Sequence, residues 1–373
     1  MDENNFSQLL LIKSLLSVEG LGNLKLLSLV SAAGDLQKIP ELTYTQLKNI
    51  KLIDANLSKR IITAISEKDN LVPELEKDLE KLLKIGGKVI TFWDTNFPDS
   101  LKRIYMPPLV LYYIGELKEV DQTSLAIVGT RMPTNYGKIQ AEKLASELAE
   151  RKITIVSGLA RGIDTAAHRG TLNSNGRTIA ITGAGPDVIY PHENKKLYHE
   201  IAEKGLILTE FKPGTKPDAQ NFPKRNRLIA GLSLGTMVIE TRFNGGAMQT
   251  AAHALEQNKE VFALPGNINS VMSEGTNRLI QNGEAKLVSN ADDIISELQG
   301  KISPFTKSKP NKVDLDLSMF EAQIYDALSE EPIHIDNIAL KTGMNTSECL
   351  INLLTMEFKG ACRQLPGKTF IRM

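Results

Sequence analysis

The sequence lacks a dominant charge of either sign. Its 373 residues hold 44 Lys and Arg against 44 Asp and Glu, so the formal net charge is zero. A chain without a basic excess does not attract a polyanion through its overall field, so any polyanion site must come from local clusters of cations. Only two cysteines are present, Cys349 and Cys362, which are too few for a disulfide framework or a cysteine-rich zinc site. These counts indicate a reducing compartment.

Further absences narrow the function classes. No run approaches the roughly 18 apolar residues of a membrane-spanning helix, and the polar first residues do not resemble a signal peptide. We therefore expect a soluble, cytoplasmic protein with no membrane partner. The histidines show no metal-ligand spacing, and the chain has no GxxxxGK[ST], GxGxxG or GxSxG motif. These absences argue against a P-loop ATPase, an NAD or FAD enzyme and a serine hydrolase, and we expect neither cofactor nor metal.

The first 75 residues predict a small helical N-terminal domain (1–75), because apolar residues recur there at helical spacing. Gly20-Leu21-Gly22 separates two of the apolar runs and predicts a tight helical hairpin. Such a hairpin is either a plain packing unit or a donor of backbone N–H groups to a phosphate, and the sequence leaves both open.

Apolar strands alternate with helical segments from Leu125 onward, namely LAIVG, ITIVSG, TIAITG, LILTEF, GTMVIE and VFALPG. Such strands predict a parallel sheet that helices cover on both faces. We therefore expect residues 76–299 to form an α/β, Rossmann-like, doubly wound domain with a mainly parallel sheet. Within this domain, short β-rich segments at 88–92 and 109–114 precede the parallel strands. The ligand site of such a domain lies at the carboxyl ends of the strands.

The last part of the chain predicts a winged-helix domain. A Lys, Ser and Pro-rich stretch indicates a linker over 300–315, and residues 316–373 follow with three helical runs and two short strands. The third helix, over 346–358, carries Glu348 and Glu357 and no cation. Because a helix that reads duplex DNA needs groups that neutralise phosphates, we expect this domain to contact protein or to regulate.

Two of the expected strands end in glycine loops that carry an arginine. Gly129-Thr130-Arg131 follows the first strand, and a helix expected from about Tyr136 would add its N-terminal amides. Taken alone, this loop fits a phosphate site and a plain βα turn equally well. In the second loop, Gly158 and Gly162 remove side chains on either side of Arg161. This second loop is the more specific sign of a phosphate site.

Polar residues around the second loop complete the expected site. Ser157 adds a hydroxyl donor, and Asp164 is placed to orient an arginine or to cap the next helix. We interpret His168, on that helix, as a packing or hydrogen-bonding residue rather than a base, because no nucleophile is paired with it. Two more loops, Gly245-Gly246 and Pro265-Gly266-Asn267, also follow strands.

A cluster of cations follows at Phe222-Pro223-Lys224-Arg225-Asn226-Arg227. Cations for phosphates beside an aromatic ring for base stacking are the composition of a single-strand nucleic-acid site. The alternative is a solvated charged face. We favour the binding site, because the apolar run Leu-Ile-Ala-Gly-Leu follows at once and predicts a buried helix.

The blocks VGTR, SGLARGID, TIAITGAG, GLILTEF, FPKRNRLIAGLS, GGAMQTA and FALPGNI resemble the DprA/Smf family (DNA-processing protein A) in order and spacing, over about residues 88–296. The resemblance implies binding of single-stranded DNA, a homodimer formed through the Rossmann-like domain, and loading of RecA recombinase onto incoming DNA during natural transformation. The implied DNA contacts are Gly129, Thr130, Arg131, Ser157, Gly158, Arg161, Gly162, Phe222, Lys224, Arg225, Asn226, Arg227, Gly245 and Gly246.

The chain departs from the family at Gly245-Gly246-Ala247, where Ser-Gly-Ser is frequent, so a phosphate there must rely on backbone N–H groups. Thr130 replaces a frequent serine and keeps the hydroxyl. The alternative function is a nucleotide-processing enzyme of the phosphoribohydrolase-like Rossmann group, whose PGGxGT motif precedes a catalytic glutamate by three residues. Here His253 stands three residues after Thr250, and the nearest glutamate is Glu256. Because glycosidic cleavage needs a carboxylate at the sugar, we expect a protein that is not an enzyme.

Overall fold

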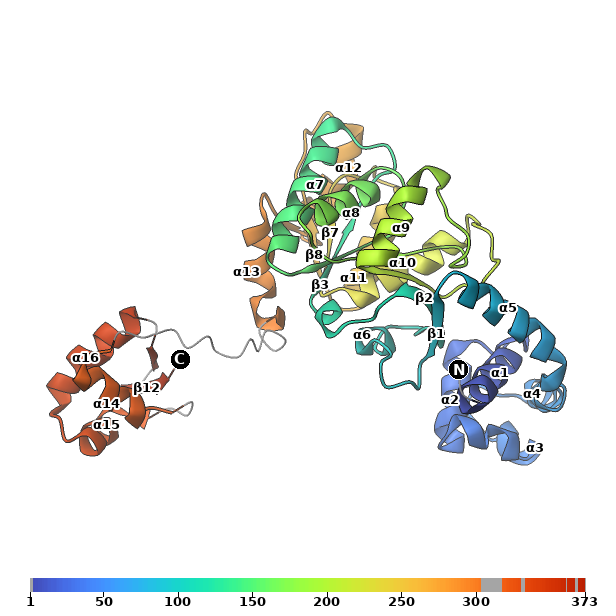
Figure 1. The fold of residues 1–373 in the computed structure, drawn as a ribbon, viewed down its shortest axis with the longest axis horizontal. Coiled ribbons are helices and arrows are strands. Elements are labelled where there is room, and N and C mark those ends of the chain that lie inside the picture. The colour runs from blue at the N-terminus through green and yellow to red at the C-terminus, as the bar shows by residue number, and fades with distance from the viewer. Residues whose placement is uncertain (1–2, 303–316, 330–332, 360, 366–367, 373) are drawn as a thin grey trace. The chain divides into compact units, whose positions relative to one another are not determined.

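The computed structural model describes residues 3–302, 317–329, 333–359, 361–365 and 368–372. The chain divides into two compact units, Met1–Phe305 and Thr306–Met373 (Figure 1). Within the described ranges, no helix combines the length and apolar character needed to cross a lipid bilayer. The same ranges hold no group of three His, Cys, Asp or Glu side chains that could bind a metal ion.

The N-terminal part of the first unit is helical, as the periodicity predicts. Its helices are α1 (Glu3–Leu16), α2 (Asn23–Ala33), α3 (Tyr44–Lys48), α4 (Ala55–Ser66) and α5 (Val72–Lys84). They enclose a core around the fully buried Ile12, Leu26 and Ile61, which Leu109, next to the second sheet strand in the chain, also joins. The predicted hairpin lies between α1 and α2, where Gly20 takes a φ of +85° that glycine adopts without strain. The expected domain boundary at residue 75 falls inside α5, so the chain shows no break there.

One mixed sheet of nine strands, in the order β1-β2-β6-β5-β4-β3-β7-β8-β9, forms the centre of this unit. The strands are β1 (Gly87–Thr91), β2 (Val110–Gly115), β3 (Ser124–Val128), β4 (Thr154–Ser157), β5 (Thr178–Ile181), β6 (Leu206–Thr209), β7 (Gly235–Val238), β8 (Glu260–Ala263) and β9 (Lys286–Leu287). In this spatial order, the seven strands that run from β6 through β3 to β9 are mutually parallel. Strands β1 and β2 add an antiparallel edge. The predicted Rossmann-like, mainly parallel sheet is confirmed.

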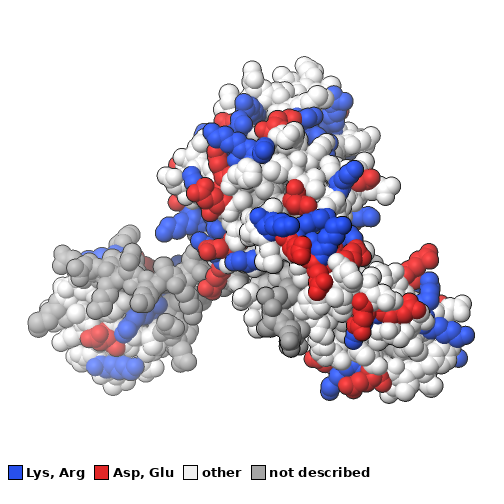
Figure 2. All heavy atoms as spheres, turned by 45° about the vertical axis from the view of Figure 1, so that its right-hand side comes forward, with Lys and Arg blue, Asp and Glu red and all other residues white. Residues whose placement is uncertain are grey.

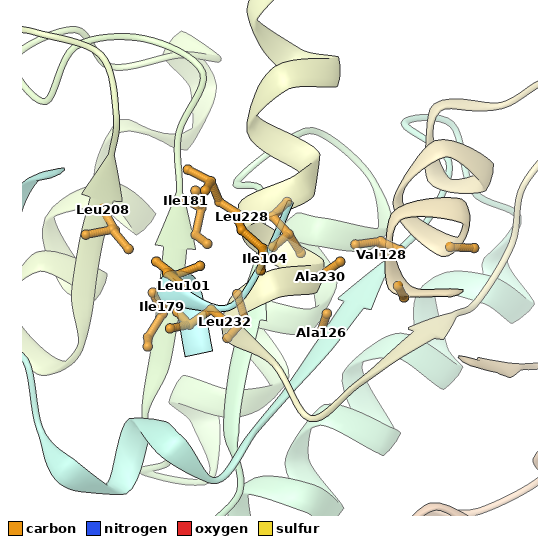
Figure 3. Close-up of a cluster of buried hydrophobic side chains, with 14 of the residues drawn as sticks. Leu101, Ile104, Ala126, Val128, Ile179, Ile181, Leu208, Leu228, Ala230 and Leu232 are labelled. Carbon is orange, nitrogen blue, oxygen red and sulfur yellow. The ribbon is translucent and has the colours of Figure 1, made fainter. Parts of the chain in front are cut away.

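Helices cover both faces of the sheet. They are α6 (Asp99–Lys102), α7 (Asn135–Glu150), α8 (Ile163–Asn173), α9 (Lys195–Lys204), α10 (Asn221–Leu232), α11 (Gly246–Glu256), α12 (Glu274–Gln281) and α13 (Ala291–Ile302). The apolar sides of α7, α8 and α13 pack on one face, and those of α10 and α11 pack on the other. Figure 3 shows Leu228 and Leu232 of α10 against Ile179 and Ile181 of β5. Every residue of β3 is buried, because both of its faces are covered.

The order of the parallel strands reverses between β3 and β7. The chain first builds β4, β5 and β6 outward on one side of β3, and then returns to place β7 on the other side. Val128 of β3 is aligned with Val238 of β7, so the loops that follow these strands leave the sheet side by side. In open α/β sheets, such a reversal opens a crevice at the carboxyl ends of the strands. The predicted glycine loops all follow parallel strands and therefore meet at this edge.

The second unit is a winged-helix domain, as predicted. Its elements are α14 (Met319–Ala327), β10 (Ile333–His334), α15 (Ile335–Thr342), α16 (Thr346–Phe358), β11 (Cys362–Leu365) and β12 (Thr369–Arg372). Buried Ile338, Leu353 and Phe370 belong to a core made by this unit alone. The expected linker 300–315 begins inside α13, which continues to Ile302, and residues 303–315 lie outside the described residues.

Candidate nucleic-acid interface

A groove of about 660 Å³ opens where β3 and β7 end. The loop after β3, the first half of α10, and the loop after β7 with the start of α11 form its walls. A smaller pocket shares Arg131, Tyr190 and Phe222 with the groove and extends it toward the loop after β4. The predicted residues that line the two cavities are Gly129, Thr130, Arg131, Gly158, Arg161, Phe222, Arg225, Asn226, Gly245 and Gly246.

An arginine and two aromatic rings meet where the groove joins the pocket. The Arg131 guanidinium lies over the Phe222 ring, 5.1 Å from its centroid. The Tyr190 and Phe222 ring centroids are 5.7 Å apart, with an angle of 39° between the rings. Arg131 is exposed and makes no ion pair with any described residue. An unpaired guanidinium beside exposed aromatic surface can hold a phosphate next to a stacked base.

Arg225 lines the groove but is held by internal hydrogen bonds, so it has a structural role that the sequence does not predict. Its side chain is buried, with the residue only 4% exposed, and Nη1 donates to the carbonyl oxygens of Gly158, at 2.7 Å, and of Ile181. Nε donates to Oδ1 of the buried Asn226 at 3.2 Å. Burial lowers the pKa of Arg225 to about 10, against the opposing effect of the Asp164 carboxylate. The guanidinium therefore ties α10 to the loop after β4 and to β5.

The loop after β4 is held from inside by Asp164. Its Oδ2 accepts from the backbone N–H groups of Gly158, at 3.1 Å, and Ala160, at 3.3 Å. Burial raises the pKa of Asp164, and the nearby Arg225 opposes that rise. Asp164 therefore orients the loop, and it lies close enough to Arg225 for the two charges to interact. A Cβ at Gly158 would lie 2.4 Å from Nη1 of Arg225, so this glycine makes room for the guanidinium rather than for a ligand.

Ser157 and Gly162 also serve the fold. The buried Ser157 hydroxyl donates to the carbonyl oxygen of Ile127 at 2.6 Å, so it is not the free donor that the sequence predicts. Gly162 has a φ of +77°, and a Cβ there would lie 2.4 Å from the Thr130 carbonyl oxygen. Neither residue lines the groove or the pocket. Both join the loops after β3 and β4 into one rigid edge.

The remaining predicted glycines differ in the space around them. A Cβ at Gly129 would meet Ile163 at 2.6 Å, and one at Gly245 would meet the Thr241 hydroxyl at 2.1 Å. These two glycines are needed for internal packing. A Cβ at Gly246 would meet nothing within 4 Å, so Gly246 is the predicted loop glycine that faces open space.

The other predicted cations are paired or lie beside the groove. Arg161 is exposed and bound to Glu193, with 2.8 Å between Nη2 and Oε2, and the Glu193 carboxylate raises its pKa. The Arg227 side chain is only 13% exposed and forms an ion pair with Glu210. Lys224 is exposed in the first turn of α10, outside the groove lining. The structure therefore does not bring the cationic run together as one exposed patch.

Sequence reasoning missed Arg242 and Tyr190, which line the groove. Arg242 stands two residues after the end of the predicted strand GTMVIE, and this position near a strand end was the available signal. Tyr190 is an isolated aromatic residue in a loop and gave none. His168 is confirmed as a buried hydrogen-bonding residue, with Nδ1 2.7 Å from the Thr178 hydroxyl. Burial lowers the pKa of His168 to about 3.

Charge is mixed on the face that Figure 2 shows. Figure 2 shows Lys and Arg gathered in patches with Asp and Glu beside them, rather than in one continuous basic face. Asp164 is the one carboxylate among the described residues that line the groove, and the loop amides already engage it. The His253 and Glu256 side chains contact each other on α11, outside that lining.

Two known protein families match long stretches of this chain. Residues 88–299 match the family of DNA recombination-mediator protein A, and residues 309–368 match the DprA winged helix domain. Protein Smf of Synechocystis is 35% identical over 84% of this chain and 87% of its own length. The DNA processing protein DprA of Streptococcus pneumoniae is 42% identical over 55% of this chain and 72% of its own length.

Two solved structures agree with this assignment. The X-ray structure of Streptococcus pneumoniae DprA covers 80% of this chain and 99% of its own, at 34% identity and a TM-score of 0.68. A Helicobacter pylori DprA structure, described for its single-stranded DNA binding mode, covers 57% of this chain and 97% of its own, at 35% identity and a TM-score of 0.52. The chain therefore belongs to the DprA/Smf family of DNA recombination-mediator proteins.

Proposed function

We propose that this protein is a recombination mediator that binds single-stranded DNA in the groove at the carboxyl ends of β3 and β7. The observation that carries the proposal is the meeting of the unpaired Arg131 with the Phe222 and Tyr190 rings at this point. Such a combination suits a single strand, whose unpaired bases offer faces for stacking while its phosphates need cations. The Helicobacter pylori relative, whose structure concerns single-stranded DNA binding, supports the same ligand.

We assign direct contact with DNA to four residues, namely Arg131, Phe222, Tyr190 and Gly246. We place Arg161 and Lys224 on either side of the bound DNA strand. Arg225 and Asn226 would act indirectly, by fixing the loops that carry the contacts. Arg161 must share its guanidinium with the Glu193 carboxylate, so its contribution to DNA binding would be smaller than that of Arg131.

We further propose, from family membership, that the protein protects incoming DNA, loads RecA recombinase onto it during natural transformation, and acts in the cytoplasm as a homodimer formed through the Rossmann-like domain. We propose that it does so without enzymatic activity. Asp164 is the carboxylate among the described residues that line the groove, and it accepts hydrogen bonds from loop amides. This supports the view, because acid–base cleavage of a nucleotide needs an available carboxylate at the sugar.

The test is a fluorescence-anisotropy titration with labelled oligo-dT. Arg131→Ala should weaken binding by roughly tenfold, because it removes a charge-assisted contact with a phosphate. Phe222→Ala should weaken it by roughly five- to a hundredfold, as expected for the loss of base stacking. The matched control is Arg169→Ala, which removes one exposed charge from α8 outside the groove. Unchanged affinity in both groove variants would refute the proposal.

The enzymatic alternative has its own assay. Incubation with nucleoside monophosphates should release no free base. Release of base by the intact protein, lost in an Asp164→Asn variant that still folds, would favour a nucleotide-processing enzyme instead.

A further inference from the structure

Arg242 differs from most of the arginines in or beside the groove. Arg161 and Arg227 each have a glutamate partner, and Arg225 is buried against backbone carbonyl oxygens. Arg242 is exposed, lines the groove, and makes no ion pair within the described part of the chain. Only Arg131 shares these three properties among the arginines that line the groove. Arg242 therefore has a free cationic charge available there for an anion.

The acidic residue nearest to Arg242 in its own loop is turned away from it. Glu240 is 2% exposed, and its carboxylate accepts hydrogen bonds from the Thr134 hydroxyl at 2.6 Å and from the Thr134 backbone N–H at 2.9 Å. Thr134 is the N-cap of α7, so this carboxylate serves the start of that helix. An anion bound at Arg242 would not have to displace it.

The start of α11 lies beside Arg242 and lacks a side-chain cap. Gly245 stands at its N-cap position and offers no side-chain hydrogen bond, so the first amides of the helix have no side-chain acceptor from the cap. A Cβ at Gly246 would meet nothing within 4 Å, so a ligand can approach the backbone there. The positive end of the helix dipole favours an anion at this position.

Thr250 provides an independent sign of a ligand. It is only 2% exposed, it lines the groove, and its hydroxyl makes no hydrogen bond with any described residue. The residue is almost wholly buried, and the surface that it keeps faces the groove, so its unpartnered hydroxyl is available to a ligand bound there. The hydroxyl lies on the same α11 face as Gly246 and Ala247, which also line the groove.

We propose that Arg242, the amides at the start of α11 and the Thr250 hydroxyl form a second phosphate subsite, which holds the phosphodiester next to the one bound at Arg131. The inference rests on the proposed function. It follows from the sheet, because β3 and β7 are adjacent parallel strands and their loops carry Arg131 and Arg242 into one groove. The second subsite would fix the direction in which the strand crosses the switch point of the sheet.

The experiment compares salt dependence in the full-length protein. The logarithm of oligo-dT affinity falls with the logarithm of salt concentration, with a slope of about 0.7 for each phosphate that is neutralised. Arg242→Ala should therefore reduce that slope by about 0.7 and weaken binding by roughly tenfold at low salt. Arg242→Lys should retain the slope, because it retains the charge. Arg169→Ala, which removes a charge elsewhere, should behave as the unaltered protein.

The hydroxyl is tested separately. Thr250→Val should weaken oligo-dT binding with no change in salt slope, because it removes a hydrogen bond and no charge, whereas Thr250→Ser should bind as the unaltered protein. A thermal melt identifies any variant that fails to fold. For such a variant, protection of the loop after β7 from hydrogen exchange, measured in the unaltered protein with and without oligo-dT, replaces the binding assay. Absence of protection there would contradict the proposal.

The outcomes separate the two proposals. If Arg131→Ala lowers the slope and Arg242→Ala does not, the second subsite is wrong and the proposed function stands. If neither variant lowers the slope, both are wrong. Thymidine monophosphate serves as competitor in the same titration. If the affinity for thymidine monophosphate depends on Arg242 while the affinity for oligo-dT does not, the subsite binds a mononucleotide and the inference is overturned.

Discussion

The groove of the first unit and the third helix of the winged-helix unit present opposite chemistry, although both belong to folds that can bind nucleic acid. The groove offers the unpaired Arg131 and Arg242. Helix α16 instead exposes Leu350, Ile351 and Leu354, with Ile351 68% exposed, and it carries no Lys or Arg. Phosphate binding needs cations, so fold alone does not assign it. The difference supports the proposal that DNA binds in the groove, and it is consistent with the expectation that α16 contacts protein.

The largest expected effect concerns the arginine that holds the groove together. Arg225→Ala should lower the free energy of unfolding by about 3 kcal/mol or more, because it leaves buried carbonyl oxygens without a donor and the buried Asp164 without its cation. Thermal or urea unfolding measures this loss. The control Arg169→Ala should stay within about 0.5 kcal/mol of the unaltered protein. Equal stability of the two variants would mean that Arg225 is a surface contact after all.

A second effect separates the buried polar framework of the groove from its exposed surface. Because the pKa of His168 is about 3 in the folded protein and about 6.5 in an unfolded chain, only the unfolded chain takes up a proton between these values. The free energy of unfolding should therefore fall as pH drops below about 6.5, by about 2 kcal/mol at pH 5. His168→Asn should lose this contribution. Urea unfolding at several pH values checks it, and identical pH dependence in both proteins would contradict it.

A smaller effect tests whether acidic neighbours weaken DNA binding at the groove. Glu193→Gln should free Arg161 and strengthen oligo-dT binding by roughly two- to threefold at low salt, because an exposed ion pair is weak and easily screened. Glu203→Gln, an equal change of charge at an exposed position in α9, should have less effect. Weaker binding by the Glu193 variant would show that this carboxylate positions Arg161 for DNA.

The smallest expected effect is in the winged-helix unit. Ile351→Glu should leave oligo-dT affinity unchanged, because α16 lacks the cations that a phosphate backbone requires. Anisotropy with the full-length variant measures this. A clear loss of affinity would bring α16 into the DNA site and remove the contrast between the two units.

Local patterns explain why much of the fold could be predicted. The buried strands such as LAIVG are apolar throughout, and the winged-helix domain is marked in the sequence by three helical runs followed by two short strands. The pairing of β1 and β2 with the edge of the main sheet joins segments distant in sequence, so no local pattern contained it.

The site was predicted less completely than the fold. The loops were located correctly, because parallel strands bring their carboxyl ends to one edge. The surroundings of each cation were not predicted, since Arg225 is buried against carbonyl oxygens and Arg227 pairs with Glu210, and neither follows from the run FPKRNR. A cluster of charges in sequence says nothing of which side of a helix each member occupies. Arg242 was not predicted, because it does not belong to a cluster of cations in the sequence.

The most direct test of the central claim is one titration of the two units against the same DNA. Labelled oligo-dT and a labelled duplex are titrated with the full-length protein, with its Arg131→Ala variant and with residues 317–373, whose core is made within that unit. We expect the full-length protein to bind oligo-dT, the variant to bind it roughly tenfold more weakly, and the winged-helix unit to bind neither DNA. Equal binding by the variant, or tight binding by the winged-helix unit, would contradict the account.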